Sequence, residues 1–505
     1  MPAPRRPMFK RLLTVAKRLG LVATAVLVTL LAVRIWDVER GPPLEPWHSF
    51  VPHELSVAEM DHGDWQTYLA AEDRAFQSVR TQVTEKLDAE DRTPINRYFS
   101  GSRIYPPGFA KDWNRSYEMM PSGAVRGAVV LLHGLTDSPY SLRHVADLYA
   151  DRGFVAVGVR LPGHGTVPGG LTEGTWQDWM AATRLAMREA RRLAGPDGPI
   201  HIVGYSNGGA LALLYTLDSL DDGALPRPAK VVLLSPMVGV TEFARFAGLA
   251  ALPAVLPAFA KAAWLNILPE FNPFKYNSFP VNAARQSYLL TQAVQEAIAS
   301  HAGDDSLKEF PPVQTFLSVL DTTVSTAAVV DALHAVLAEA RSELVLFDIN
   351  RNADVDSLAM FRPSTLAALS DLLPPAPRPF RSIVVTNRNR ATPDVEALVT
   401  EAGATGTTAI PLPLTYPHDV YSLSHIAVPF PLSDGLYGLD PAETPAEDFG
   451  ISLGTLSSRG ESRALVVGMD FIMRMQSNPF FPYMAERIAA DLPPPESPAS
   501  AASPD

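Results

Sequence analysis

The sequence predicts an α/β fold in which helices flank a mostly parallel central sheet. Short, unbroken apolar runs, typical of buried parallel strands, alternate with helical patterns through the middle of the chain. Strands are expected at residues 128–132, 154–159, 200–203 and 230–236, with helices at 142–149, 176–193 and 210–215. Ligands of such sheets bind at the carboxyl ends of strands, and the turns that contain His133 and Ser206 both follow predicted strands.

The segment 199–215 contains the motif Gly204-Tyr205-Ser206-Asn207-Gly208 between a predicted strand and a predicted helix. This G-x-S-x-G pattern in a strand–turn–helix context is typical of a nucleophilic serine. Glycines flank the serine because a turn this tight has no room for neighbouring Cβ atoms. The turn would hold the Ser206 hydroxyl out of the sheet, beside backbone N–H groups at a helix start. An ordinary serine in a glycine-rich turn is the alternative.

Composition excludes several kinds of chemistry. The net charge is −12 and the body of the chain has no basic patch, so a nucleic-acid partner is not expected. The absence of cysteine excludes disulfides, thiolate catalysis and cysteine-ligated metals. The 11 histidines show no spacing typical of metal ligands. We therefore expect neither a metal nor a cofactor.

The N-terminus differs from the acidic remainder. Six basic residues within 1–18 precede the uncharged run 19–33, and Arg34-Ile35-Trp36 closes it. We expect residues 19–36 to be a transmembrane signal anchor, with residues 1–18 cytoplasmic and the catalytic domain on the outer or periplasmic side. A cleaved signal peptide, which would give a secreted protein, is the alternative.

The rest of the chain divides into five expected parts. Residues 37–120 form a spacer and a helical extension whose apolar stripe at 65–87 needs no function beyond packing. Residues 121–236 and 306–478 form the two halves of the α/β core, and the apolar, proline-rich insertion 237–305 forms a cap or, alternatively, a packing subdomain. Residues 479–505 form a final helix and a disordered tail. Of the late strands at 343–349 and 382–386, one is expected to be extra to the basic sheet.

A serine nucleophile needs a base, and the base needs an acid that orients it. On folds with this elbow the chain order is serine, acid, histidine. Asp321 directly follows the predicted strand 313–320 and is the favoured acid. Its rivals after the next strand are Asp348, Asp354 and Asp356. His425 is the favoured base because apolar residues follow it, whereas His418 resembles an exposed turn and His334 lies in a helical stretch where it would pack.

Five segments carry a family resemblance: LLHGLTDSPYSLR (131–143), RLPGHG (160–165), GYSNGG (204–209), SVLDTTV (318–324) and SHIAVPF (424–430). Together they resemble the monoacylglycerol-lipase-like branch of the α/β-hydrolase superfamily, which includes lysophospholipases, carboxylesterases and serine aminopeptidases. The resemblance covers roughly residues 120–430. It departs from the family pattern at 341–423, where the chain carries an additional strand-like segment.

The resemblance implies an α/β-hydrolase fold and roles for five residues. Ser206 would be the nucleophile, Asp321 the acid and His425 the base, while the backbone N–H groups of Leu135 and Asn207 would form the oxyanion hole. His133 and His164 are expected to organise their loops rather than to transfer protons.

The expected function is hydrolysis of carboxylic esters, with medium or long acyl groups, at a membrane. An acyltransferase, thioesterase or serine peptidase with the same triad, or a non-catalytic ligand-binding protein, is the alternative.

Overall fold

The core of the protein is one large mixed sheet. The computed structural model describes residues 6–239, 257–303, 306–321, 323–337, 341–352, 372–417, 422–454 and 475–495. Its ten-stranded sheet has the order β1-β3-β2-β4-β5-β8-β9-β10-β11-β12. The strands are β1 (Tyr117–Met119), β2 (Gly127–Leu132), β3 (Phe154–Val159), β4 (Ile200–Tyr205), β5 (Lys230–Leu234), β8 (Val313–Ser318), β9 (Ser342–Phe347), β10 (Arg381–Asn387), β11 (Asp394–Thr400) and β12 (Thr408–Thr415).

Every pairing from β3 through β10 is parallel, whereas β1, β11 and β12 pair antiparallel. Strands β2, β3, β4, β5, β8 and β9 are buried along their whole length, which explains why they are continuous apolar runs in the sequence. The predicted α/β-hydrolase fold with a mostly parallel sheet is confirmed, and each strand predicted up to residue 386 is present.

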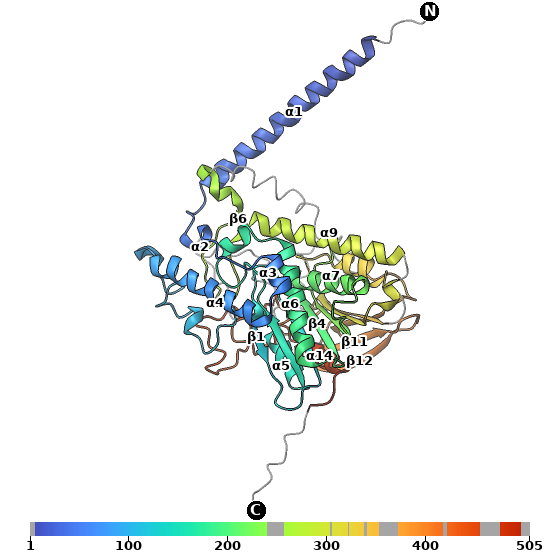
Figure 1. Ribbon diagram of the computed structural model, residues 1–505. Coiled ribbons are helices and arrows are strands. Elements are labelled where there is room, and N and C mark those ends of the chain that lie inside the picture. The colour runs from blue at the N-terminus through green and yellow to red at the C-terminus, as the bar shows by residue number, and fades with distance from the viewer. Residues whose placement is uncertain are drawn as a thin grey trace, which may run out of the picture.

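Helices cover both faces of the sheet (Figure 1). Two clusters of apolar side chains form the core, one on each face of the sheet. Successive side chains of β2 point to opposite faces, so Val130 packs in the first cluster and Val129 and Leu131 pack in the second. The first cluster is covered by α6 (Trp176–Ala194), α7 (Asn207–Asp221) and α9 (Val281–Gly303). The second is covered by α5 (Arg143–Ala150) and α14 (Phe481–Ala489).

The late strands extend the sheet. Segments 343–349 and 382–386, one of which we expected to be extra to the basic sheet, both join it as β9 and β10, which pair in parallel. Which of the two is extra stays a prediction. Strands β11 and β12, which we did not predict, extend the sheet further. Strand β12 is largely exposed and contains Pro411 and Pro413, which are tolerated because a strand at the edge leaves N–H groups unpaired.

The N-terminal extension consists of helices and irregular loops. It comprises α1 (Arg6–Glu39), α2 (Pro46–Ser49), α3 (Val57–His62), α4 (Trp65–Gln82), η1 (Thr84–Lys86), η2 (Ala89–Asp91) and η3 (Pro106–Gly108). The predicted helix at 65–87 is therefore shorter than expected, because the chain tightens into η1 after Val83.

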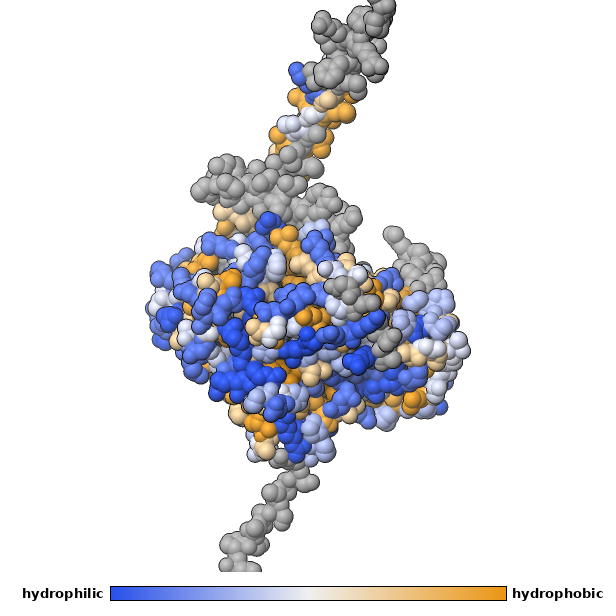
Figure 2. All heavy atoms as spheres, turned by 45° about the vertical axis from the view of Figure 1, so that its right-hand side comes forward, coloured by the Kyte–Doolittle hydropathy of each residue, from blue (hydrophilic) through white to orange (hydrophobic). Residues whose placement is uncertain are grey.

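Helix α1 projects from the body of the molecule, and apolar side chains such as Leu19, Leu21 and Val22 are exposed on it (Figures 1 and 2). Among the residues that the structure describes, we find no helix with the length and apolar character needed to cross a membrane. The anchor expected at residues 19–36 is therefore not supported, and the location of the protein stays a prediction.

The insertion between β5 and β8 is described only in part, because residues 240–256 lie outside the described ranges. Its described elements are η8 (Pro257–Ala263), the two-stranded sheet of β6 (Trp264–Asn266) and β7 (Phe279–Pro280), and helix α9, which packs against α7. The expected cap at 237–305 stays a prediction. The apolar segment at 465–471 and most of the expected tail, from 496 to 505, also lie outside the described residues.

Candidate active site

Ser206 lies on a strained turn between β4 and α7. Its φ of 54° and ψ of −115° place a non-glycine residue in a conformation that L-residues rarely adopt. A Cβ atom on Gly204 would lie 2.3 Å from the carbonyl oxygen of Gly208, and one on Gly208 would lie 2.0 Å from that of Leu132. Only glycine fits at these two positions, which is the physical reason for the spacing of the motif.

The structure brings Ser206, His425 and Asp321 together although 219 residues separate the first two along the chain. The Ser206 Oγ atom lies 2.9 Å from Nε2 of His425. The opposite ring nitrogen, Nδ1, lies 2.7 Å from Oδ2 of Asp321. The three residues are 8%, 8% and 9% exposed, so their contacts are largely screened from water. This is the geometry needed to move a proton from a hydroxyl to an oriented imidazole.

Asp321 lies in the turn after β8, where backbone groups fix its carboxylate. Its Oδ1 atom accepts hydrogen bonds from the backbone N–H groups of Thr323 at 2.9 Å and Val324 at 3.0 Å. Burial alone would raise the pKa of Asp321, but the charge of His425 and the hydrogen bonds to the carboxylate outweigh it, and the net pKa lies below its ordinary value. Asp321 is therefore held ionised beside the imidazole.

His425 is positioned by groups that the sequence did not reveal. The ring of Tyr205 stacks on the imidazole with 5.5 Å between ring centroids, and the Tyr205 hydroxyl donates to the His425 carbonyl at 3.4 Å. The backbone N–H of Ser424 donates to the carbonyl of Met475 at 3.0 Å, which ties the residue before His425 to a distant segment. The only hint of Tyr205 in the sequence was its place beside the nucleophile.

The rival residues lie elsewhere or outside the described chain. The Oδ2 atom of Asp348 accepts from Arg351 Nε and from Thr386 Oγ1, each at 2.7 Å, so this carboxylate is held at the β9–β10 edge. His334 is buried with Nε2 2.9 Å from Thr315 Oγ1, and burial lowers its pKa to about 3. It packs as predicted. Three further rivals lie outside the described residues: Asp354, Asp356 and His418.

The two predicted oxyanion residues lie on turns that meet at Ser206. A Cβ atom on Gly134 would lie 3.3 Å from that of Ser206, so the turn before Leu135 lies against the serine. Asn207 is the first residue of α7, and its backbone N–H therefore has no acceptor within the helix. Its side-chain Oδ1 accepts from Ser287 Oγ of α9 at 3.2 Å, which fixes Asn207 in place.

His133 and His164 organise loops, as predicted. The backbone N–H of Leu161 donates to Nε2 of His133 at 3.1 Å, and the other ring nitrogen, Nδ1, lies 2.9 Å from the Gly134 carbonyl. Since Nε2 is an acceptor, the ring is neutral and carries its proton on Nδ1. Burial lowers the pKa of His133 well below its ordinary value and that of His164 to about 3.

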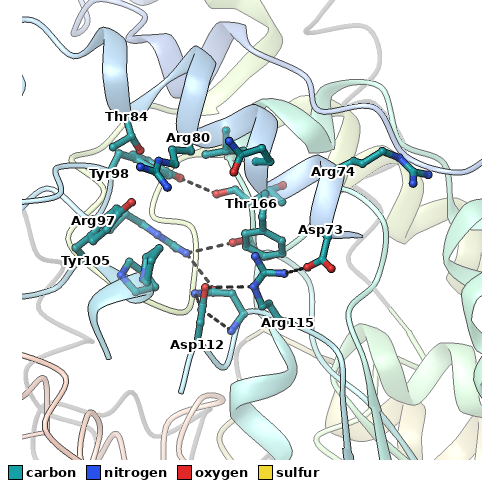
Figure 3. Close-up of a pocket in the computed structure, with 17 residues that line it drawn as sticks. Asp73, Arg74, Arg80, Thr84, Arg97, Tyr98, Tyr105, Asp112, Arg115 and Thr166 are labelled. Carbon is teal, nitrogen blue, oxygen red and sulfur yellow. Dashed lines mark hydrogen bonds and ion pairs between the residues drawn. The ribbon is translucent and has the colours of Figure 1, made fainter. Parts of the chain in front are cut away.

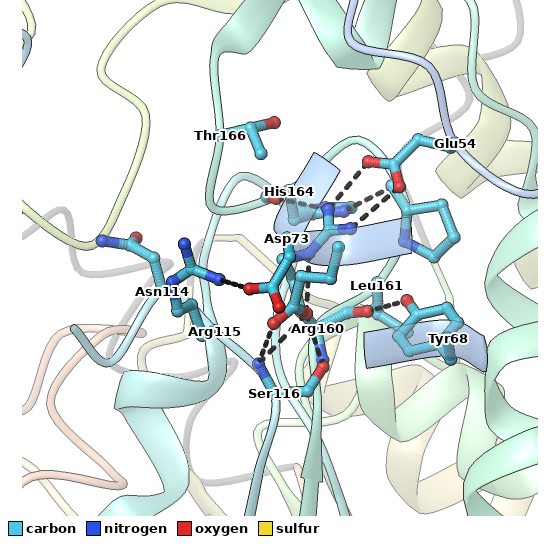
Figure 4. Close-up of polar contacts among 12 residues, drawn as sticks. Glu54, Tyr68, Asp73, Asn114, Arg115, Ser116, Arg160, Leu161, His164 and Thr166 are labelled. Carbon is cyan, nitrogen blue, oxygen red and sulfur yellow. Dashed lines mark hydrogen bonds and ion pairs between the residues drawn. The ribbon is translucent and has the colours of Figure 1, made fainter. Parts of the chain in front are cut away.

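A buried ion-pair network ties the N-terminal extension to the loop after β3 (Figure 4). Arg160 is 1% exposed and contacts Glu54 through NH1 and NH2, each at 2.8 Å, and Glu72 through Nε at 3.0 Å. Ser116 Oγ donates to Glu72 at 2.7 Å. Burial raises the pKa of Glu72, and the charge of Arg160 offsets part of that rise. We did not predict this network from the sequence. One signal was available: Glu72 is a charged residue on the apolar face of α4, and a buried carboxylate needs a partner.

One cluster of potential metal ligands occurs among the described residues, at His144, Asp434 and Glu447. The guanidinium of Arg143 contacts Asp434 at 2.7 Å and Glu447 at 2.6 Å. A guanidinium therefore already pairs with both carboxylates, and we assign no metal to this cluster.

A family model described as "Serine aminopeptidase, S33" matches residues 123–337. The matched residues make up less than half of the chain. Among characterised proteins that are similar to this chain, a thermostable monoacylglycerol lipase of Bacillus sp. (strain H-257) is 32% identical over 115 residues. That alignment spans 22% of this chain and 44% of the relative.

Solved structures that are similar to this chain align with about half of it. A monoacylglycerol lipase of Paleococcus ferrophilus is 17% identical and has a TM-score of 0.35, with 46% of this chain and 89% of that chain covered. A thermostable carboxyl esterase of Bacillus coagulans is 14% identical and has a TM-score of 0.34, with 50% and 92% covered.

Proposed function

We propose that this protein is a serine hydrolase that cleaves carboxylic esters through an acyl-enzyme. The observation that carries the proposal is the continuous contact from Ser206 Oγ through both nitrogens of His425 to Asp321. The match of residues 123–337 to a serine aminopeptidase model supports a serine hydrolase, and the similarity to a monoacylglycerol lipase supports esters as its substrates.

In the proposed reaction His425 Nε2 takes the hydroxyl proton as Ser206 Oγ attacks the ester carbonyl. Asp321 stabilises the imidazolium that forms and fixes its tautomer. The imidazolium then gives its proton to the leaving alcohol, which leaves an acyl group on Ser206. In the second half His425 removes a proton from water as the water oxygen attacks the acyl carbon. The bond from that carbon to Ser206 Oγ then breaks, the imidazolium returns its proton to Oγ, and the carboxylic acid leaves.

Negative charge that develops on the carbonyl oxygen needs donors fixed in advance. We assign this role to the backbone N–H groups of Leu135 and Asn207. The position of the Asn207 N–H at the start of α7, where the helix provides no acceptor, supports Asn207, and the close approach of the Gly134 turn to Ser206 supports Leu135. Loss of one such donor typically costs about 10²–10³ in kcat.

The proposed substrates are lipid esters of the monoacylglycerol kind, with medium or long acyl chains. The Bacillus relative is a monoacylglycerol lipase, which supports this class. Burial of an acyl chain favours binding by about 0.8 kcal/mol per CH₂ group, so an apolar cap would select longer chains. Measuring kcat/KM across a series from acetyl to octanoyl esters tests this part, and a preference for acetyl esters would contradict it.

The triad is tested by labelling the full chain with a fluorophosphonate probe, which reacts only with an activated serine. We expect labelling of the wild type and none of Ser206→Ala. Ser219→Ala is the matched control, because Ser219 is a buried serine within α7 whose hydroxyl donates to the Thr216 carbonyl. Equal labelling of Ser206→Ala, or a wild type that neither labels nor cleaves esters, would contradict the proposal.

A further inference from the structure

A cavity that does not include the triad lies between the N-terminal extension and the loop after β3 (Figure 3). Its volume is about 540 Å³, which is within the range of small-molecule sites. Helix α4 and η1 form one side, the segment 97–115 forms another, and Gly165 and Thr166 close it. Ser206, Asp321 and His425 are not among its lining residues.

The buried guanidinium of Arg97 points toward the middle of this cavity (Figure 3). Arg97 is 2% exposed. Its NH1 donates to the carbonyls of Asn272 at 3.1 Å and Lys275 at 3.4 Å, and its NH2 donates to Asn114 Oδ1 at 3.1 Å and to the Gly165 carbonyl at 3.4 Å. All four acceptors are neutral, and two of the contacts are long for a hydrogen bond. Nε has no acceptor.

Buried charges in proteins are normally paired with an opposite charge. Within the described part of the chain, no carboxylate forms an ion pair with Arg97. Glu270 acts on it only at longer range, because the Glu270 carboxylate is held by the backbone N–H groups of Asn277 at 3.0 Å and Ser278 at 2.8 Å. The charge of Arg97 therefore lacks a direct partner.

The charged lining of the cavity is also unbalanced. Four arginines line it, at positions 74, 80, 97 and 115, against two aspartates, at 73 and 112. Both aspartates lie beside Arg115, at 2.6 Å and 3.9 Å. The remaining walls are apolar or aromatic and include Phe76, Val79, Tyr98 and Tyr105. Arg80 pairs with Glu85 at 3.3 Å, so the excess of positive charge is small. The cavity combines this excess with surface suited to an apolar body.

We propose that this cavity binds a small carboxylate carried on an apolar body, such as a medium-chain fatty acid. The carboxylate would lie between Arg115 and Arg97 and provide the negative charge that Arg97 lacks. The apolar body would lie against Phe76, Tyr98 and Tyr105. This site goes beyond the proposed hydrolysis, because it binds its ligand without using the triad.

Isothermal titration of the full chain carrying Ser206→Ala with octanoate tests the proposal. We expect saturable binding that is at least about 10-fold tighter than that of octanamide, which has the same body without the charge. Arg115→Gln should weaken octanoate binding by about 10-fold or more for the same reason. Arg388→Gln, an exposed arginine on the far β10–β11 turn, removes the same charge and should leave the affinity unchanged.

Thr84→Trp provides an independent variant, because it fills the cavity and leaves every arginine in place. It should also abolish octanoate binding, and thermal unfolding shows whether it folds. If it does not fold, Arg115→Gln and octanamide decide the matter. Octanoate affinity that is unchanged in Arg115→Gln or in a folded Thr84→Trp, equal binding of octanamide, or no binding at all would overturn the proposal. Since Ser206 is absent throughout, failure here is independent of whether the wild type cleaves esters.

Discussion

The backbone N–H of Leu161 donates a hydrogen bond to Nε2 of His133, and the same ring contacts the carbonyl of Gly134. A single neutral imidazole therefore joins the loop after β3 to the turn before Leu135. Leu161 follows Arg160, whose guanidinium is held by Glu54 and Glu72 of the N-terminal extension. One continuous series of contacts thus runs from the extension to the proposed oxyanion hole.

Glu54→Gln should disturb that series and lower kcat more than it raises KM, because a shifted Leu135 N–H affects the transition state more than substrate binding. We also expect a loss of about 1–3 kcal/mol in the free energy of unfolding, since a buried charged hydrogen bond is weakened. Steady-state kinetics and urea unfolding measure the two effects. Glu309→Gln is the control, because Glu309 pairs with Arg227 at the surface and should matter little. Loss of stability with kcat unchanged would show a purely structural role.

Ser206→Ala and His425→Ala should each lower kcat by roughly 10⁴–10⁶ while the fold survives. Asp321→Asn should be nearly as severe, because an amide neither holds His425 in the required tautomer nor stabilises the positive charge of its protonated ring. Asp348→Asn is the matched control, since Asp348 is bound to Arg351 and Thr386. Ester hydrolysis and circular dichroism of each purified variant provide the measurement. Near-normal activity in His425→Ala together with an inactive His418→Ala would show that the base is assigned wrongly.

Acid should destabilise the protein partly through His334. Its folded pKa is about 3, whereas an unfolded histidine titrates near 6.5. Between these values the unfolded chain binds a proton that the folded chain does not, so stability falls as pH falls, by up to about 1.4 kcal/mol per pH unit from this group. His334→Gln should flatten the decline between about pH 6.5 and pH 5. Urea unfolding at several pH values measures it, with exposed His53→Gln as control. An unchanged slope in His334→Gln would contradict the prediction.

The location of the protein is open to a direct measurement. If residues 19–36 form an anchor, the full chain should remain in the membrane fraction, and a chain that begins at residue 41 should be released on lysis. Protease added outside intact spheroplasts should digest the catalytic domain if residues 1–18 stay in the cytoplasm. Recovery of a released form that begins near residue 33 would instead indicate a cleaved signal.

Local patterns were enough to predict much of the fold and the candidate site. Buried strands are continuous apolar runs, the elbow at Ser206 needs glycines at fixed spacing, and chain order selected the Asp321 and His425 that the structure brings to Ser206. Strand β12 escaped prediction because its prolines and exposed positions mask the strand pattern.

Contacts between distant segments were beyond such reasoning. Arg160 lies 106 residues from Glu54 and 88 from Glu72, and no local rule joins them. The stacking of Tyr205 on His425 and the hydrogen bonds from Arg97 to the segment 272–275 also join residues that are far apart in the sequence. These contacts depend on how the extension and the loops fold back over the sheet.

The partners of Arg160 have a consequence for where the folding unit begins. The family match starts at residue 123, yet the carboxylates that balance this buried arginine lie at 54 and 72. A chain trimmed to the family boundary would keep the guanidinium and lose both counter-charges, along with the core side chains Met60, Trp65 and Tyr68. The boundary of sequence similarity is therefore not the boundary of independent folding, and a minimal catalytic domain of this protein has to begin ahead of Glu54.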